Sequence, residues 1–320
     1  MSNKYCSPNN SSNTITCLSN KSLLKIAEIL NYKYRVNIQV PKYPLNENER
    51  KILWENIENE LFNINSFGCQ DDYCVLDDEK ISSNKQIYNS FRPPKPFTWN
   101  INKQTWLSTL DIRVVLNQYR AKHPDFEFIG PVPLDFDKQL FFDFCVSNEL
   151  CKINLKKMIK RNKTKLGIVF NLDTHDQSGS HWVALFVDFN LGNIYYFDSY
   201  GLKPPQEIIN LMKKIEIQGN QLINEGLLKI NKKNAFAYKN GTSNRELCYL
   251  DNSNINKETF NSFYNCNRFQ FKNSECGMYS IHFIVQFLEG KKYNEIVNNI
   301  INDDVMNQMR DFYYRPSKNT

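Results

Sequence analysis

The sequence has few histidines and no long apolar run. Only four of its 320 residues are histidine, so few positions can supply an imidazole base or metal ligand. No apolar run approaches the ~20 residues that a membrane span needs. The first eight residues lack the basic and apolar regions of a secretory signal. We therefore expect a soluble protein made in the cytosol, with no membrane partner.

The charge balance and the cysteines set further limits. The formal net charge of +6 permits weak attraction to nucleic acid or acidic partners without requiring it. The nine cysteines are odd in number and scattered, which does not indicate a disulfide framework. Cys69 and Cys74 could form half of a zinc site, but no His or Cys pair at ligand spacing follows nearby. Loop or packing roles are therefore favoured for both.

The pattern of hydrophobic residues predicts two domains. Residues 1–20 are rich in Ser and Asn and are expected to be loose. Amphipathic helices are predicted over residues 21–30 and 47–62. The segment from Phe91 to Pro96 is the clearest linker, because its prolines stiffen the chain and forbid helix. We expect an N-terminal extension over residues 1–95 and a second domain over residues 96–320.

The second domain mixes helices and strands. Helices are predicted over residues 102–119, with Trp106 near the start, over 204–216 and within 293–313, and residues 124–136 read as loop or edge strand. Between Lys152 and Lys165 the chain carries seven basic residues. A solvated helix face and turn is the favoured interpretation of this basic run, and a contact with DNA or another polyanion is the alternative.

One strongly apolar helix is predicted after Cys276. A short β-prone segment, residues 269–271, leads through a polar turn to Cys276. The residues that follow are apolar on nearly every side, which predicts a buried central helix that stops near Gly290. A cysteine at a helix N-terminus meets unpaired backbone N–H groups and the positive end of the dipole, and both favour the thiolate. Cys276 is therefore either a nucleophile or one more small residue of the core.

A predicted hairpin brings a histidine and a carboxylate together. Strands are expected over residues 166–170, 181–189 and 194–198, with a turn between the last two. His181 opens one strand of this hairpin and Asp198 ends the other, so antiparallel pairing places both at the same edge of the sheet. If Cys276 is a nucleophile, His181 is its base and Asp198 fixes the tautomer.

A fourth residue completes the candidate site. Gln270 lies six residues before Cys276. Its amide N–H and the backbone N–H of Cys276 could together stabilise an oxyanion. A single Gln is more often a surface residue, so its position has meaning only together with the other three.

These residues resemble the catalytic pattern of the adenain/Ulp1-like (clan CE) cysteine proteases. The likeness is carried by His181-Trp182, by Asp198 with its neighbours, and by Gln270 with Cys276-Gly277 six residues later. Within this family the sequence most resembles the branch of large DNA viruses that includes the polyprotein-processing protease of African swine fever virus. The likeness covers most of residues 60–315.

The resemblance implies a fold and a biological role. It implies a circularly permuted papain-like α/β (α+β) core with a mostly helical N-terminal extension. It also implies cleavage after small residues, typically at Gly-Gly type sites of viral structural polyproteins, during maturation in the host cytoplasm and the virion. Trp182 is expected to roof a groove too narrow for side chains, and Trp106 matches a tryptophan of the family's substrate tunnel.

Two positions depart from parts of the family. Thr109 stands where the desumoylating members carry Asp, which weakens a SUMO-like substrate. Asp198 follows the commoner acid of the broad family, where the swine fever branch has Asn; either can orient a histidine.

The sequence therefore predicts a cysteine endopeptidase. Cys276 attacks the scissile carbonyl, His181 acts as base and then acid, and Asp198 orients His181. Gln270 and the Cys276 N–H hold the oxyanion. No metal or organic cofactor is implied. The alternatives are an isopeptidase for SUMO or ubiquitin-like conjugates, an acyltransferase, and a structural virion protein with an inactive protease fold.

Overall fold

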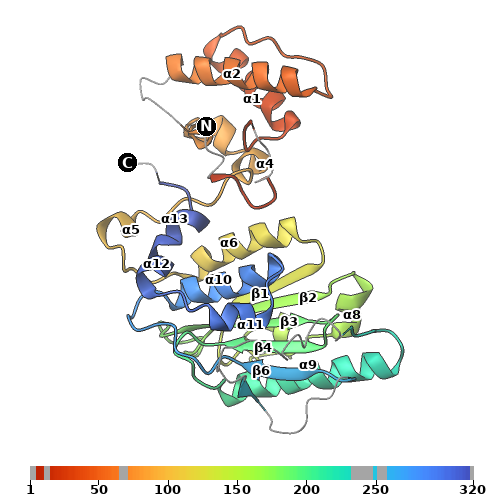
Figure 1. The fold of residues 1–320 in the computed structure, drawn as a ribbon. Helices are drawn as coiled ribbons and strands as arrows, with labels where there is room; N and C mark the ends of the chain where they lie inside the picture. The colour runs from red at the N-terminus through yellow and green to blue at the C-terminus, as the bar shows by residue number, and fades with distance from the viewer. Residues whose placement is uncertain (1–4, 11–14, 65–70, 232–247, 251–257, 318–320) are drawn as a thin grey trace. The chain divides into compact units, whose positions relative to one another are not determined.

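The chain divides into two compact units. The computed structural model describes residues 5–10, 15–64, 71–231, 248–250 and 258–317. One unit comprises Met1–Lys95 with Asp311–Thr320, and the other comprises Pro96–Arg310 (Figure 1). The division after Lys95 lies in the Pro-rich segment. The C-terminal segment, which the sequence analysis placed in the second domain, groups with the first unit because Arg315 exchanges backbone hydrogen bonds with Pro93 and Lys95.

The first unit is helical. Its elements are α1 (Asn20–Tyr34), α2 (Glu47–Ile64), the 3-10 helix η2 (Asp72–Asp77), α3 (Glu79–Ser82) and α4 (Lys85–Tyr88). Both long helices were predicted. The expectation of a loose N-terminus is wrong for residues 5–10 and 15–19, because Cys6 is disulfide-bonded to Cys17 and the Ser7 N–H donates to the Ser90 carbonyl.

The cysteines correct another expectation. Disulfides join Cys6 to Cys17, Cys145 to Cys151 and Cys248 to Cys266, and Cys74 is also disulfide-bonded. The fold brings the three described pairs to Cα separations of 4.9, 6.2 and 5.9 Å, within the range for bridging. The prediction that no disulfide framework exists is therefore wrong. Cys74 has no thiolate to offer a metal, and Cys69 lies outside the described residues.

The second unit is built on a mixed six-stranded sheet of order β1-β2-β3-β4-β6-β5. The strands are β1 (Phe126–Pro133), β2 (Lys165–Asn171), β3 (Trp182–Asp188), β4 (Asn193–Phe197), β5 (Cys248–Tyr249) and β6 (Asn261–Tyr264). The pairs β2–β3, β3–β4 and β5–β6 are antiparallel, whereas β1–β2 and β4–β6 are parallel. The predicted hairpin is confirmed as β3 and β4, and the predicted edge strand as β1.

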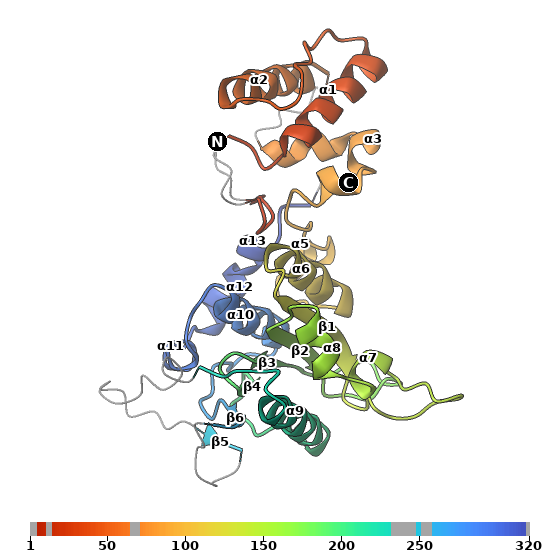
Figure 2. The same cartoon turned by 90° about the vertical axis from the view of Figure 1, so that its right-hand side faces the viewer.

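Helices cover both faces of this sheet (Figures 1 and 2). On one face, alternate residues of β2, β3 and β4 form a core with α8 (Leu155–Lys160) and α9 (Gln206–Asn224). On the other face, α6 (Thr109–Lys122) contacts β1 and α10 (Cys276–Leu288) contacts β3. The remaining helices of this unit are short: α5 (Thr98–Ile101), α7 (Asn148–Cys151), α11 (Tyr293–Asn298) and α12 (Asp303–Gln308). Helix α13 (Arg310–Tyr313) starts at the last residue of this unit and continues into the first.

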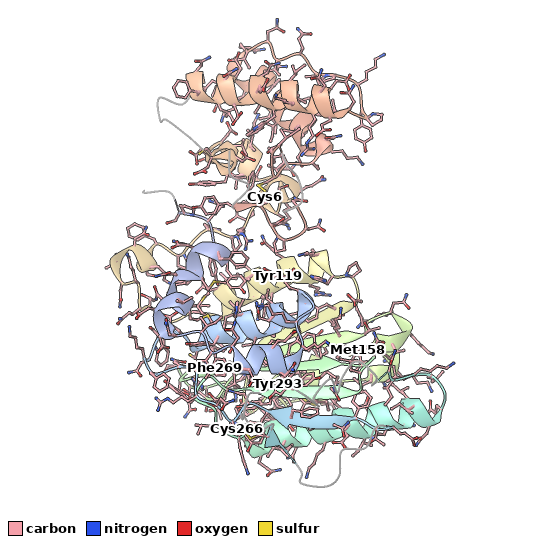
Figure 3. All side chains as sticks on the ribbon, in the orientation of Figure 1. Cys6, Tyr119, Met158, Cys266, Phe269 and Tyr293 are labelled. Carbon is pink, nitrogen blue, oxygen red and sulfur yellow. A yellow bond between two sulfur atoms is a disulfide. The ribbon has the colours of Figure 1, made fainter. Side chains whose placement is uncertain are left out.

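The buried central helix is confirmed as α10. Ten of its residues are buried, from Cys276 to Leu288. Its aromatic side chains pack between the sheet and neighbouring rings such as Phe269 and Tyr293, both labelled in Figure 3. Gly290 follows with a φ of +86°, the left-handed conformation that commonly ends a helix.

Several elements differ from the prediction, and α9 ends at Asn224 rather than near residue 216. The helix expected from residue 102 begins at Thr109, because Ser108 and Asp111 form a capping box that fixes its first turn. Trp106 therefore lies in the loop before α6. No strand forms over residues 269–271, because the backbone N–H groups of Phe269 and Gln270 both donate to the Ser199 carbonyl. No helix in the described part of the chain is long and apolar enough to span a membrane.

Gly219 on α9 tests the packing of the core between the sheet and the helices α8 and α9. A Cβ at this position would lie 2.6 Å from Cζ of Phe260, whose side chain is only 1% exposed. Because the ring has no room to move, we expect Gly219→Ala to lower the free energy of unfolding by about 1–3 kcal/mol. Urea unfolding followed by circular dichroism measures the change.

The control is Lys213→Ala, at an exposed position of the same helix. It should change the free energy of unfolding by less than about 0.5 kcal/mol. Equal stability of the Gly219→Ala protein and the wild type would contradict the packing argument.

Candidate active site

His181 and Asp198 meet at one end of the β3–β4 hairpin. His181 immediately precedes β3 and Asp198 immediately follows β4. Nε2 of His181 lies 2.7 Å from Oδ1 of Asp198. The carboxylate is 1% exposed and the imidazole is largely buried. The geometry is that of a histidine oriented by a buried acid.

Neighbouring groups hold this pair in place. The Asp198 N–H donates to Asn265 Oδ1 at 2.8 Å, and Asn265 Nδ2 donates to the Asp198 carbonyl at 2.6 Å. The Tyr200 N–H donates to the same carboxylate oxygen that faces His181, at 2.8 Å. The Tyr200 ring stacks on the imidazole with centroids 4.7 Å apart. Sequence reasoning missed both residues: Tyr200 could have been noticed two positions after Asp198, but nothing marks Asn265.

Cys276 is the first residue of α10, is 2% exposed, and is the free cysteine among the described residues. Burial alone lowers the pKa of His181, but hydrogen bonds to Asp198 and to Cys276 outweigh it and raise that pKa to about 9. Since Nε2 faces Asp198, Nδ1 is the nitrogen left for the sulfur. His181 is therefore an imidazolium at neutral pH, and it places a cation beside the sulfur.

Gln270 hydrogen-bonds Ser199, the residue after Asp198, and its amide group is already engaged. It is fully buried. Its Oε1 accepts a hydrogen bond from Ser199 Oγ at 2.6 Å, and its Nε2 donates to the Lys272 carbonyl at 2.6 Å. An amide nitrogen carries two hydrogens, so the second N–H is the one that can serve an oxyanion.

A buried ion pair precedes the nucleophile. The carboxylate of Glu275, the N-cap of α10, lies 3.1 Å from Nη2 of Arg310, and their side chains are 2% and 4% exposed. Asn307 Nδ2 also donates to Glu275, at 2.7 Å, and Arg310 Nη1 donates to the Thr105 carbonyl at 2.8 Å. Arg310 thus ties the start of α10 to the loop that carries Trp106. The sequence analysis missed it, because its partners lie far away along the chain.

Both predicted tryptophans line a groove of about 560 Å³. Trp106 is 45% exposed, whereas Trp182 is 6% exposed and donates its indole N–H to the Leu107 carbonyl at 2.9 Å. A Cβ on Gly277 would lie 3.0 Å from Leu107 Cβ and 3.2 Å from Trp182 Cδ1. The first turn of α10 therefore packs tightly against the groove wall. Other lining residues include Thr109, Pro131, His175 and Gly179.

The described residues contain no cluster of three or more His, Cys, Asp or Glu suited to a metal ion. The candidate site instead consists of groups for nucleophilic and general acid–base chemistry. The fold thus brings His181, Asp198, Gln270 and Cys276 to one end of the sheet.

Comparisons with known proteins agree with this chemistry. Residues 152–320 match the Ulp1 protease family, C-terminal catalytic domain. A protein of Acanthamoeba polyphaga mimivirus named as a thiol protease is 34% identical over 235 residues, which cover 72% of this chain and 63% of that protein. The chain thus spans less than two thirds of that relative's length.

African swine fever virus supplies a relative and a solved structure. Its SUMO-1 cysteine protease is 24% identical over 289 residues, 84% of this chain and 92% of that protein. The crystal structure of the protease of this virus superposes with a TM-score of 0.62 at 20% identity, covering 99% of this chain and 98% of the other, and so shows a shared fold. The chain therefore belongs to the Ulp1 protease family of cysteine peptidases.

Proposed function

We propose that this chain is a cysteine endopeptidase that processes viral structural polyproteins during virion maturation. The observation that carries the proposal is His181, which hydrogen-bonds Asp198 and whose pKa is raised by Asp198 and by Cys276, beside a groove. The viral origin of the thiol-protease relatives supports a viral substrate. The site of action that fits is the cytoplasm of the infected host cell, at virus assembly sites, and the virion.

The geometry supports a two-step reaction. The Cys276 thiolate attacks the scissile carbonyl carbon, and a C–S bond forms as the carbonyl oxygen becomes an oxyanion. The C–N bond then breaks while His181 gives its proton to the leaving amine. In the second step His181 takes a proton from water, which attacks the thioester carbonyl. The C–S bond breaks, the new carboxyl end is released, and the thiolate–imidazolium pair is restored.

Two donors serve the oxyanion in this proposal. The backbone N–H of Cys276 belongs to the first turn of α10 and has no intrahelical acceptor. The second N–H of Gln270 joins it. Asp198 orients the His181 ring by accepting a hydrogen bond from Nε2.

The groove favours small residues on the acyl side. Leu107 and Trp182 approach Gly277 so closely that even an added methyl group would be crowded there. A substrate segment that runs past these residues to Cys276 must be thin, and a Gly-Gly type site meets this requirement. Trp106 and Trp182 would flank its backbone.

An isopeptidase for SUMO-like conjugates is the second candidate, because the swine fever relative is named as a SUMO-1 protease. Thr109, which lines the groove, makes this candidate less favoured, because the desumoylating members of the family carry Asp at this position.

The basic run Lys152–Lys165 supports at most a weak polyanion contact. Four of its seven cations bond to protein groups, namely Lys156, Arg161, Lys163 and Lys165, and the other three, Lys152, Lys157 and Lys160, have no ion-pair partner among the described residues.

The proposed activity is tested with a Gly-Gly-X peptide and a SUMO-aminomethylcoumarin substrate. The protein should cleave the peptide after the second glycine, as mass spectrometry would show, and should cleave the SUMO substrate much more slowly. A Gly-Gly vinyl sulfone should label Cys276, and Cys276→Ala or His181→Ala should abolish turnover, because each removes a reacting group. Peptide cleavage by the Cys276→Ala protein would refute the assignment of the nucleophile.

The pH dependence tests the His181–Asp198 pair. With a pKa of about 9, His181 stays protonated at neutral pH, so kcat/KM should fall as the pH rises through about 9. Asp198→Asn removes a hydrogen bond that raises the pKa, while burial continues to lower it. The alkaline limb should then move down by about one pH unit or more.

The matched control is Asp135→Asn, because Asp135 Oδ2 lies 2.6 Å from Nδ1 of His175 in a second histidine–carboxylate pair. This variant should leave the alkaline limb near pH 9. An unmoved limb in Asp198→Asn would show that His181 is not the group that titrates.

The role of Gln270 predicts a selective loss of rate. Gln270→Ala should lower kcat by about 10²–10³-fold with a KM within a few-fold of wild type, because an oxyanion donor acts in the transition state. Ser199→Ala is the control: it removes the hydrogen bond to Gln270 Oε1 but keeps the donor N–H. Steady-state kinetics of the two variants separate these effects, and an equal loss in both would contradict a donor role.

A further inference from the structure

Three side chains form a surface cluster beside His181, here called the Arg268 cluster: Arg268, Tyr200 and Phe271. The Arg268 guanidinium lies 5.3 Å from the centre of the Tyr200 ring and 4.9 Å from that of Phe271. Tyr200 in turn stacks on His181. Phe271 is 68% exposed, and Arg268 is exposed as well.

The position of Arg268 is fixed at its base. Its Nε donates to the Gln270 carbonyl at 2.8 Å. This bond holds the guanidinium against the backbone of Gln270, the residue proposed to stabilise the oxyanion. Stacking between two rings orients its plane, and a planar fork of N–H donors suits a carboxylate. The cluster therefore presents an ordered cation next to the reacting groups.

No protein carboxylate neutralises this cation among the residues that the structure describes. The nearby acids are already engaged: Asp303 accepts from the backbone N–H groups of Phe271 and Lys272, and Asp304 pairs with the Lys272 ammonium. Arg268 thus differs from Lys272, because the charge of Lys272 is neutralised by Asp304. An exposed, unbalanced arginine at a binding site is suited to an acidic ligand.

The cluster lies apart from the groove of Trp106 and Trp182. None of its three residues lines that groove. Tyr200 comes instead from the loop after Asp198, and Arg268 and Phe271 come from the segment around Gln270. The cluster therefore lies beside the site on elements that do not form the groove. If the groove holds the acyl part of the substrate, the chain that continues past His181 meets the Arg268 cluster.

We propose that Arg268 binds an acidic side chain of the substrate one or two residues after the scissile bond, with Tyr200 and Phe271 as its apolar walls. This inference rests on the proposed endopeptidase function and names a feature of its substrates. Arg268 is a specificity residue in this view, since it binds substrate on the leaving side and takes no part in proton transfer.

The test uses peptides with Gly-Gly on the acyl side that differ only in Asp, Asn or Lys at the first or second position after the cleaved bond. The wild type should show a kcat/KM about tenfold higher for Asp than for Lys at the preferred position, because Asp gains a partly exposed charge pair while Lys is repelled by a similar amount. This ratio should shrink in high salt. Arg268→Gln should bring the Asp/Lys ratio close to one, and Arg268→Glu should invert it.

Lys229→Gln is the matched control, since it removes an exposed cation near Asn231, which bonds to Asn190 in the hairpin turn opposite His181. Its Asp/Lys ratio should equal that of the wild type. Equal cleavage of the Asp and Lys peptides by the wild type, or a ratio unchanged in Arg268→Gln, would overturn the inference while the proposed function stands. Failure to cleave any of the peptides would overturn the proposed function and this inference with it.

Discussion

The packing of α10 against the β3–β4 hairpin is the interaction on which the rest of the site depends. Phe287 stacks on Phe186 of β3 at 4.4 Å and on Tyr195 of β4 at 4.9 Å, and Phe283 stacks on Phe197 at 4.6 Å. Each such pair contributes about 0.5–1.5 kcal/mol beyond its buried area. Because these rings interlock along the helix, α10 cannot slide along the strands. The sulfur at its start is thereby set against the histidine at the strand's start.

The same constraint explains how buried charges are tolerated near the sulfur. Glu275 must be buried because it immediately precedes a helix that is itself buried, and an unpaired carboxylate there would cost several kcal/mol. Arg310 and Asn307 balance and hydrogen-bond it. The charge next to the nucleophile is thus neutralised within the protein, so it does not oppose the thiolate. Asp198 is left as the buried acid that acts on His181.

Much of this arrangement could be predicted from the sequence because local patterns encode it. The apolar run after Cys276 specifies a buried helix, and the turn between two strands places His181 beside Asp198. The errors have long-range causes. Whether residues 269–271 form a strand depends on Ser199, and the Arg310 contact joins residues 35 positions apart. Trp106 lies outside the helix predicted to contain it because the capping box of Ser108 and Asp111 starts α6 at Thr109.

The groove side of the site and the side of the Arg268 cluster differ in how they can select a substrate, and this difference follows from the fold. On the groove side, α10 and the loop before α6 converge so closely that a Cβ at position 277 would crowd Leu107 and Trp182, and in the proposed function selection there is by exclusion of bulk. On the other side, residues 269–271 are held by their backbone bonds to Ser199 and Asp303. The side chains of Arg268 and Phe271 are exposed to solvent. The selection proposed there acts by attraction, through charge and exposed aromatic surface. The proposed substrate site therefore selects by shape before the cleaved bond and by charge after it.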